Sequence, residues 1–272
     1  MTTGPSPNPT SSPDPDPASS PNPGPIRGIL FDVDRTLFDF DTSEEHGLLA
    51  HLADEGLIAH FPTPAAALKL WREILDEAYA AYLAGTLTFA EQQRVRTRRF
   101  LARIDLLPAD GMSDAAATAW FAGYAAHRDS RWAAFPDAEP LLRALAPAYR
   151  LGVVSNSAVA HQRRKLDVIG LLPYLGTALI CSEDHGAHKP DPTIFLAGCA
   201  ALGLPPHQVL FLGDNYAADA IGARDAGLIP CWLDRNATDD GTAARDGIPV
   251  IHTLAELPNV LSSTPPAYAP HD

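Results

Sequence analysis

Five short apolar runs alternate along this chain with longer stretches in which apolar residues recur at helical spacing. The runs are Arg27–Phe31, Arg150–Val154, Thr177–Cys181, Val209–Leu212 and Ile229–Leu233. Each run is bounded by Gly, Pro, Asp or Ser, which is typical of strand ends. Strands that alternate with helices favour a parallel sheet covered on both faces, so we predict an α/β fold.

One long interval breaks this alternation. Between about Thr42 and Phe135 we find no strand pattern. Apolar residues recur there at helical spacing instead, for example at Leu68, Trp71 and Ile74. The pattern predicts roughly four or five helices inserted after the first strand. We interpret their aromatic residues as packing residues and assign them no chemistry.

The two ends of the chain differ from the middle in composition. Residues 1–25 consist largely of Pro, Ser, Asp, Asn and Thr, without a basic residue or an apolar stretch. This composition is not that of a targeting signal, and it predicts a disordered, Pro-rich tail. We expect a shorter flexible tail at residues 262–272. Between the tails we expect a core of residues 26–41 and 135–261, with the helical insertion at residues 42–134.

Composition and charge narrow the class of protein. The chain has 272 residues, of which 46% are hydrophobic, enough for a sizeable core. Its net charge of -13 argues against nucleic acid or an anionic membrane as a partner. No apolar run approaches the ~20 residues of a membrane span. The three cysteines are widely spaced in apolar surroundings, so we expect reduced thiols and a cytoplasmic protein.

Two carboxylates follow the first predicted strand directly. Asp32 and Asp34 lie in the segment Phe31-Asp32-Val33-Asp34-Arg35-Thr36. Because the predicted strand ends here, a turn can bring both carboxylates to one site. Such a pair suits a divalent cation, or a nucleophile beside a proton donor. A solvated, Asp-rich turn is the alternative.

Polar residues also follow two other predicted strands. They are Ser155, Asn156 and Ser157 after the second strand, and Gly213, Asp214, Asn215 and Asp219 after the fourth, with Lys189 between the two groups. In a parallel sheet these strand ends share one edge. Carboxylates suit Mg²⁺, a lysine and a hydroxyl suit phosphate oxygens, and a remaining aspartate can act as a nucleophile. These groups are the parts that phosphoryl transfer needs.

Each of these residues also has a structural interpretation when it is taken alone. Ser155 and its neighbours can cap a helix, Lys189 can be a surface lysine, and Gly213 with Asp214 can form an ordinary turn. Their joint occurrence, in this order and each near a strand end, favours a common site.

Four motifs in this order resemble those of the haloacid dehalogenase-like (HAD) hydrolase superfamily. D-x-D-x-T corresponds to Asp32–Thr36, a Ser closing an apolar strand to Ser155, a Lys before Pro-Asp-Pro to Lys189, and G-D-x-x-x-x-D to Gly213–Asp219. The resemblance covers about residues 26 to 260, in the branch with a helical cap after the first strand. It implies a Rossmann-like, doubly wound parallel sheet with this cap inserted.

The resemblance also implies a catalytic centre. Asp32 would attack phosphorus and form an aspartyl-phosphate, and Asp34 would protonate the leaving group and then activate water. Mg²⁺ would be held by Asp32, the backbone carbonyl of Asp34 and Asp214. Asp219 would not bind the metal directly but would hold the metal site or Lys189 in position.

Four residues are implied for binding the transferring phosphoryl group. Ser155 and Lys189 would contact its oxygens directly and take part in catalysis. Thr36 and Asn156 complete the set of phosphate-binding candidates, with Thr36 bracing the loop of the nucleophile.

Asp34 separates two chemistries within this superfamily. The dehalogenating members use no aspartate at that position and need no metal, so Asp34 argues for a phosphatase. Arg35, by contrast, stands where many relatives have glycine, and its long side chain can reach the cap or a substrate anion.

The substrate is less defined than the chemistry. The stretch Thr36–Asp41 and the acidic, polar start of the cap are similar to nucleotidases that act on nucleoside 5′-monophosphates. We therefore expect a Mg²⁺-dependent phosphomonoester hydrolase for a small phosphorylated metabolite. Sugar-phosphate or phosphoglycolate hydrolysis, a phosphomutase and a non-catalytic binding protein remain alternatives. The arginine-rich stretch from Arg94 to Arg103 contains either a substrate contact or a solvated helix face, and we favour the latter.

Overall fold

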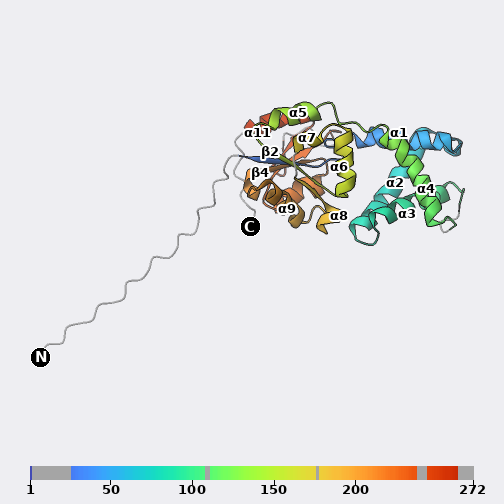
Figure 1. Cartoon of the computed structure of the whole chain (residues 1–272), viewed down its shortest axis with the longest axis horizontal. Helices are drawn as coiled ribbons and strands as arrows, with labels where there is room; N and C mark the ends of the chain where they lie inside the picture. Colours follow the sequence, from blue (N-terminus) through green and yellow to red (C-terminus); the bar gives the residue numbers. More distant parts are fainter. Residues whose placement is uncertain (2–25, 108–110, 176–177, 238–243, 263–272) are drawn as a thin grey trace.

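The computed structural model describes residues 1, 26–107, 111–175, 178–237 and 244–262 (Figure 1). The two predicted tails therefore lie outside the described residues, except for Met1 and Ser262. Ser262 is the last residue of a short helix, α11 (Leu257–Ser262), rather than the first residue of the expected C-terminal tail.

A seven-stranded sheet forms the centre of the molecule, in the order β3-β2-β1-β4-β5-β7-β6. Its strands are β1 (Gly28–Phe31), β2 (Arg150–Ser155), β3 (Leu179–Cys181), β4 (Val209–Gly213), β5 (Ile229–Leu233), β6 (Ala244–Arg245) and β7 (Ile248–Ile251). All neighbouring strands pair in parallel except β6 with β7. The predicted α/β fold with a doubly wound parallel sheet is confirmed.

The last two strands, β6 and β7, were not predicted. The apolar run of β7 has only four residues and contains Pro249, a residue that argues against a strand in a sequence pattern. It lies near the edge of the sheet, where a proline is tolerated. The five predicted strands agree with β1 to β5 within two residues, apart from Thr177, which lies outside the described residues.

Helices cover both faces of the sheet (Figure 1). One face is covered by α5 (Ala138–Leu145), α6 (Val159–Val168), α7 (Leu172–Leu175) and α11, and the other by α8 (Ser182–His185), α9 (Pro192–Leu202) and α10 (Gly222–Asp225). Successive residues of β1 point to opposite faces. Ile29 and Phe31 pack on the side of α5 and α6, whereas Leu30 packs on the side of α9. The central strand is thus buried on both sides, as a parallel sheet requires.

Four helices form a bundle that is inserted in the chain between β1 and α5. They are α1 (Phe40–Asp54), α2 (Pro64–Leu83), α3 (Phe89–Arg103) and α4 (Asp114–Asp129), with a 3₁₀ turn, η1 (Ile58–His60), after α1. Three of these helices begin at hydroxyl N-caps, Thr63, Thr88 and Ser113. Their apolar faces enclose a separate hydrophobic cluster around Trp71, so this bundle has a core of its own.

The two chain segments that connect the bundle to the sheet lie side by side. The backbone N–H of Asp39 donates to the carbonyl of Ala133 at 3.0 Å, and the backbone N–H of Phe135 donates to the carbonyl of Leu37 at 3.0 Å. The first helix begins at Phe40, two residues before the boundary expected at residue 42. The division of the chain into a core and a cap at residues 42 and 134 stays a prediction.

The remaining turns are short. They are the 3₁₀ turns η2 (Pro206–Gln208) and η4 (Leu254–Glu256) and the π-helical turn η3 (Tyr216–Ile221). Within the described part of the chain, no helix has both the length and the apolar character needed to cross a lipid bilayer.

Replacement of Leu30 should show how much the central strand contributes to stability. Leu30 is fully buried in β1. We expect Leu30→Ala to lower the free energy of unfolding by about 3 kcal/mol, because it removes buried methyl groups and leaves a cavity. Leu196→Ala in α9 is the matched control, since Leu196 is 42% exposed, and it should cost less than about 1 kcal/mol. Urea unfolding of the two variants measures the difference, and equal losses would contradict this account.

Candidate active site

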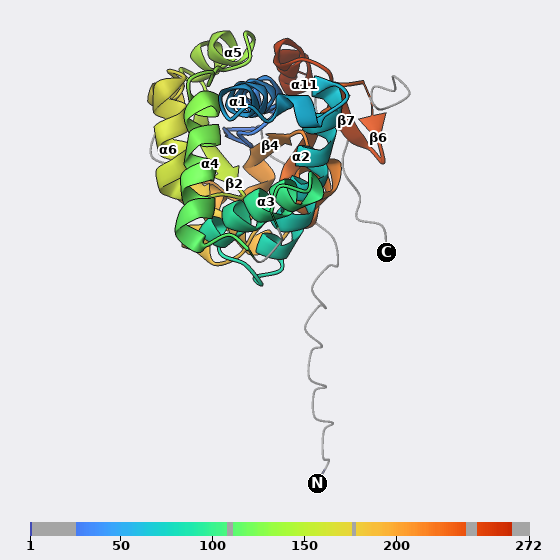
Figure 2. The same ribbon diagram turned by 90° about the vertical axis from the view of Figure 1, so that its right-hand side faces the viewer.

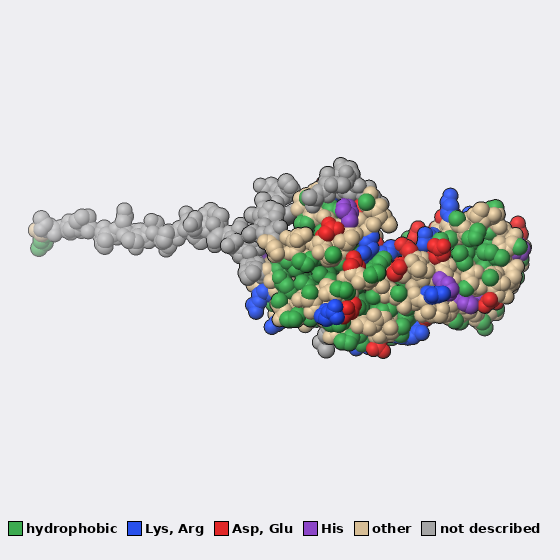
Figure 3. All heavy atoms as spheres, turned by 90° about the horizontal axis from the view of Figure 1, so that it is seen from above, with side chains coloured by type: hydrophobic (Ala, Val, Ile, Leu, Met, Phe, Trp, Pro, Cys, Tyr) green, Lys and Arg blue, Asp and Glu red, His purple; other side chains and the backbone are tan. Residues whose placement is uncertain are grey.

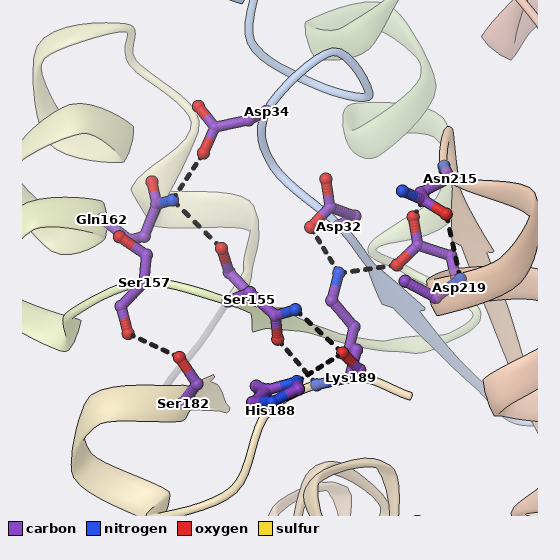
Figure 4. Close-up of polar contacts among 12 residues, drawn as sticks. Asp32, Asp34, Ser155, Ser157, Gln162, Ser182, His188, Lys189, Asn215 and Asp219 are labelled. Atoms are coloured by element: carbon purple, nitrogen blue, oxygen red, sulfur yellow. Dashed lines mark hydrogen bonds and ion pairs between the residues drawn. The ribbon is translucent and has the colours of Figure 1, made fainter. Parts of the chain in front are cut away.

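Most of the predicted site residues meet at the carboxyl ends of β1, β2 and β4 (Figure 4). These three strands are neighbours in the sheet, so the residues that follow them share one edge. Asp32 follows β1, Ser155 ends β2 and Asp214 follows β4. Lys189 and Asp219 reach the same place from the loop before α9 and from the turn η3.

Lys189 connects the two aspartates on either side of it. Its Nζ donates a hydrogen bond to Asp32 Oδ1 at 2.6 Å and forms an ion pair with Asp219 Oδ1 at 2.7 Å. All three side chains are buried. Burial alone would lower the pKa of Lys189, but the charges of Asp219 and Asp32 outweigh it and hold this pKa well above its usual range. The lysine is therefore a permanent cation at this site.

Asn156 holds the loop that carries Lys189. Its Nδ2 donates to the Lys189 carbonyl at 3.0 Å, and its Oδ1 accepts the Lys189 backbone N–H at 2.7 Å. The side-chain amide of Asn156 is thus engaged by the main chain of the lysine. A phosphate contact by Asn156 stays a prediction, and the geometry gives this residue a positioning role.

Three carboxylates lie close enough together to share a cation. Oxygens of Asp32, Asp214 and Asp219 lie within 4.8 Å of one another. Burial raises the pKa of Asp32 to about 7, helped by Asp219 and opposed by Lys189. Burial and the charges of Asp32 and Asp219 raise the pKa of Asp214 to about 8. Crowded carboxylates of this kind repel one another, and a bound cation would relieve the repulsion.

The donor set fits a hard divalent cation such as Mg²⁺, which prefers carboxylate oxygens. Asp219 is already engaged, because its Oδ2 accepts the backbone N–H of Asn215 at 2.9 Å and its Oδ1 faces Lys189. Asp32 and Asp214 are therefore the better candidates for direct ligands. The indole of Trp232 donates to the Asp214 carbonyl at 2.8 Å and fixes the backbone at that position.

Asp34 lies apart from this carboxylate group, on the side of Ser155 (Figure 4). Its carboxylate accepts hydrogen bonds from Gln162 Nε2 at 2.9 Å and from Lys165 Nζ. The same Gln162 Nε2 also donates to Ser155 Oγ at 3.0 Å. Burial would raise the pKa of Asp34, but Lys165 and Gln162 outweigh it and hold that pKa below its usual range.

Gln162 and Lys165 were not predicted as site residues. Both are buried on α6, the helix that follows Ser155. In the sequence they stand among polar residues, His161 to Lys165, which is the pattern of a solvated helix face. Only the packing of α6 against the loop after β1 shows that two of these side chains face Asp34.

Thr36 lies in the loop after β1 and is fully buried. Its carbonyl accepts a hydrogen bond from the Arg235 guanidinium at 2.9 Å, while its hydroxyl has no hydrogen-bond partner among the described residues. Arg235 also makes two hydrogen bonds to Asp137, the residue that directly precedes α5. Thr36 is thus connected through Arg235 to the start of α5, and its predicted phosphate contact stays a prediction.

Arg35 reaches the bundle. Its backbone is left-handed, with φ of 64°, a conformation that glycine adopts most easily. Its Nε donates to Asp41 in the first turn of α1 at 3.0 Å, and its guanidinium lies 4.7 Å from the Phe40 ring. This contact with α1 accounts for an arginine at a position where glycine would be less strained.

Three exposed or half-buried arginines of α3 have partners within the bundle. Arg94 and Arg98 pair with Asp114, and Arg99 pairs with Glu77. These contacts agree with a solvated helix face rather than with substrate contacts. Arg96, in contrast, is buried.

The helical bundle closes over the site. The hydroxyl of Tyr79 in α2 donates to the carbonyl of Asn156 at 2.8 Å, and that of Tyr82 lies 3.3 Å from Ser182 Oγ. Burial raises the pKa of Tyr79, and the charges of Asp32 and Asp34 add to the rise. Acidic and basic side chains gather at the surface where it is hollowed between the bundle and the sheet (Figure 3).

Comparison with known proteins identifies one family. A family model described as haloacid dehalogenase-like hydrolase matches residues 26–227. Pyrimidine 5'-nucleotidase YjjG of Escherichia coli is 27% identical over 232 residues, covering 84% of this chain and 96% of that protein. Glyceraldehyde 3-phosphate phosphatase of Methanopyrus kandleri is 27% identical over 222 residues, covering 79% and 87%.

Solved structures show the same fold. A HAD-hydrolase, YfnB of Bacillus subtilis with bound magnesium, superposes with a TM-score of 0.68 at 24% identity, covering 88% of this chain and 99% of that one. A 2-haloacid dehalogenase of Pseudomonas syringae superposes with a TM-score of 0.60 at 26% identity, covering 87% and 98%.

Removal of the buried ammonium should destabilise the chain strongly. Lys189→Met leaves Asp32 and Asp219 buried without a countercharge, so we expect the free energy of unfolding to fall by about 3–5 kcal/mol at pH 8 without added metal. Arg143→Met is the matched control, because Arg143 forms only an exposed pair with Glu139 at 3.4 Å and should cost less than about 1 kcal/mol. Chemical denaturation measures both, and a Lys189→Met loss as small as that of the control would refute the account.

The raised pKa of Asp214 predicts a pH dependence of stability in metal-free protein. Its pKa is about 8 when folded and near 4 when unfolded, so its stabilising effect is complete below pH 4 and is lost as the pH rises through 8. Asp214→Asn removes this titration. From pH 5 to pH 8.5 we expect the variant to gain roughly 1–3 kcal/mol relative to the unmodified chain. Thermal unfolding in EDTA measures this gain, and a constant difference across the range would argue against it.

Proposed function

This chain belongs to the haloacid dehalogenase-like hydrolase family, and from that premise we propose that it is a Mg²⁺-dependent phosphomonoester hydrolase. The observation that carries the proposal is the buried Asp32–Lys189–Asp219 group beside Asp214, with Asp34 held separately next to Ser155. The family match confirms the resemblance that the four motifs indicated. The relatives named as phosphatases and a nucleotidase also confirm the prediction that this chain is a phosphatase.

Asp32 is the nucleophile in this proposal. Lys189 binds its Oδ1, which leaves Oδ2 to attack the phosphorus of the bound ester. A bond forms between this oxygen and phosphorus while the bond from phosphorus to the leaving oxygen breaks, and an aspartyl-phosphate results. Ser155 and Lys189 bind oxygens of the transferring group, and the fixed charge of the lysine offsets the charge that develops there.

Asp34 moves the proton in both half-reactions. In the first its protonated form donates a proton to the leaving oxygen. In the second the resulting carboxylate takes a proton from the water that attacks the aspartyl-phosphate, while the bond from phosphorus to Asp32 breaks, phosphate is released and the protonated form of Asp34 is restored. Gln162 bonds both to Asp34 and to Ser155 Oγ, so it holds the proton-transfer group beside the phosphoryl site. Lys165 favours the ionised state of Asp34, the state that the second half-reaction requires.

Asp32, the backbone carbonyl of Asp34 and Asp214 are the proposed ligands of Mg²⁺. The cation would neutralise phosphate oxygens and the crowded carboxylates, so that Asp32 is ionised at neutral pH. Asp219 has an indirect role in this proposal. It pairs with Lys189 and accepts the backbone N–H of Asn215, just before η3, instead of contacting the substrate.

We place the substrate among small phosphorylated metabolites, with nucleoside 5′-monophosphates first. The support is the local similarity at Thr36–Asp41 and the nucleotidase among the relatives. Sugar phosphates and phosphoglycolate are the alternatives within the same chemistry, and a phosphomutase or a non-catalytic binding protein the alternatives outside it. Asp34 favours a phosphatase over the dehalogenase chemistry of the Pseudomonas syringae neighbour.

We also place the protein in the cytoplasm, with a small phosphorylated metabolite rather than nucleic acid or a membrane as its partner. All three cysteines are free and buried, and burial raises the pKa of each thiol, as suits reduced core residues.

Release of inorganic phosphate tests the proposed function. We expect Mg²⁺-dependent release from a panel of nucleoside monophosphates, sugar phosphates and phosphoglycolate, suppressed by EDTA. Asp32→Asn should lower kcat by about 10³-fold or more because it removes the nucleophile, whereas Asp76→Asn, an exposed aspartate on α2, should leave it unchanged. Phosphate retained on a sugar would indicate a mutase, halide release from 2-chloropropionate a dehalogenase, and no turnover at all a binding protein.

A further inference from the structure

The hydroxyl of Ser155, at the end of β2, makes one hydrogen bond to the described part of the chain. The side chain is 2% exposed. Its Oγ accepts from Nε2 of Gln162 at 3.0 Å (Figure 4). A hydroxyl has one proton to donate and two lone pairs that can accept. The bond from Gln162 uses a lone pair, so the proton of Ser155 is left for another acceptor.

Asp34 sets the direction of this hydrogen bond. Nε2 of Gln162 also donates to Asp34 Oδ2 at 2.9 Å, and the other oxygen of that carboxylate accepts from Nζ of Lys165. An ionised carboxylate can only accept hydrogen bonds. If the amide of Gln162 were turned round, its Oε1 would face Asp34 Oδ2, and the two acceptors would repel each other. The NH₂ end of Gln162 therefore lies between Asp34 and Ser155 and donates one proton to each.

The helix that carries Gln162 is packed on two sides. Gln162 is the fourth residue of α6 and is 0% exposed. One turn later, Leu166 is fully buried in the main hydrophobic cluster of the sheet. Arg164 pairs with Asp129, the last residue of α4, at 2.7 Å, and Figure 2 shows α6 beside α4. Contacts with the sheet and with the bundle thus hold the Gln162 side chain in place between Asp34 and Ser155.

Stability alone does not account for a glutamine at this position. Oε1 of Gln162 is buried and has no hydrogen-bond partner among the residues that the structure describes. Buried acceptors are almost always paired, and an unpaired one is unfavourable. The donor end of the side chain thus makes two hydrogen bonds, while the acceptor end makes none. This asymmetry favours a role in the reaction that depends on the donor end.

We propose that Gln162 is a positioning residue that directs the hydroxyl proton of Ser155 toward the transferring phosphoryl group. The inference rests on the proposed function and deepens it. The oxygens of an ionised phosphoryl group accept hydrogen bonds, so Ser155 binds them through its own O–H. By donating to Oγ, Gln162 keeps that proton available for the substrate. Its second N–H holds the carboxylate of Asp34 beside the same group.

The proposal makes the polarity of the side chain at position 162 more important than its size. Gln162→Glu keeps nearly the same shape but presents oxygens to both neighbours. Ser155 would then donate its proton to the new carboxyl group, and its lone pairs would face the phosphoryl oxygens. Gln162→Met keeps a similar length but donates no proton, so the hydroxyl of Ser155 would be free to rotate. Both changes should weaken phosphate binding, the first more than the second.

Binding of inorganic phosphate tests this role apart from proton transfer, because the reaction product binds without any need for an acid or a base. Calorimetric titration of phosphate into the protein with Mg²⁺ measures its Kd. We expect Gln162→Met to raise this Kd by about fivefold and Gln162→Glu by about tenfold or more, since a hydrogen bond to a charged group is weakened or lost. Gln208→Met is the matched control. Gln208 is half-buried just before β4, at the strand end opposite the catalytic edge, so this change should leave Kd unaltered.

A double-mutant cycle with Ser155→Ala separates action through Ser155 from a general structural effect. Without the hydroxyl, Gln162→Met should change the Kd of phosphate by less than about twofold. In ester turnover it should then still lower kcat, through Asp34, while leaving KM unchanged.

Two results would overturn the role of Gln162 and leave the phosphatase standing, provided that the unmodified chain releases phosphate from esters. One is the same loss of phosphate binding with and without Ser155. The other is unchanged binding in both Gln162→Met and Gln162→Glu. An unmodified chain that neither turns over any ester nor binds phosphate would overturn the proposed function as well.

Discussion

The ion pairs of Lys189 with Asp32 and Asp219 are the interaction on which the rest of the site depends. Two carboxylates buried at the end of a parallel sheet repel each other and lose their hydration, which is unfavourable unless a cation lies between them. Lys189 supplies that cation from a loop that Asn156 fixes by two hydrogen bonds. Because the lysine stays charged, the nucleophile can be held in a dry site, where electrostatic stabilisation of a phosphoryl group is strongest.

Asp32 and Asp34 are two residues apart yet lie in opposite electrostatic surroundings. Between them Val33 is fully buried in the main hydrophobic cluster and anchors the loop. Asp32 faces other carboxylates, and its pKa is raised, whereas Asp34 faces Lys165, and its pKa is lowered. One turn at a strand end thus provides two carboxyl groups with different proton affinities, and a cation bound beside Asp32 would favour the ionised state that a nucleophile needs.

The sequence predicted those features whose cause is local. Strands β1 to β5 are apolar runs with clear ends, and the acidic residues at those ends have few structural reasons to be there. The features that the sequence did not predict depend on packing between elements that are distant in the chain. Lys165 and Arg96 both stand in arginine- and lysine-rich stretches that are typical of solvated helices, and only the tertiary arrangement buries them, one beside Asp34 and the other beside Glu44. No spacing within α3 or α6 distinguishes a buried cation from an exposed one.

The reacting groups and the helical bundle belong to separately packed parts of the chain. The reacting groups sit on strand ends within a sheet that is buried on both faces, where packing limits their movement. The helices of the bundle are covalently joined to the sheet by two chain segments, paired at Phe38 and Ala134. A change inside the bundle can therefore be accommodated without moving Asp32 or Lys189.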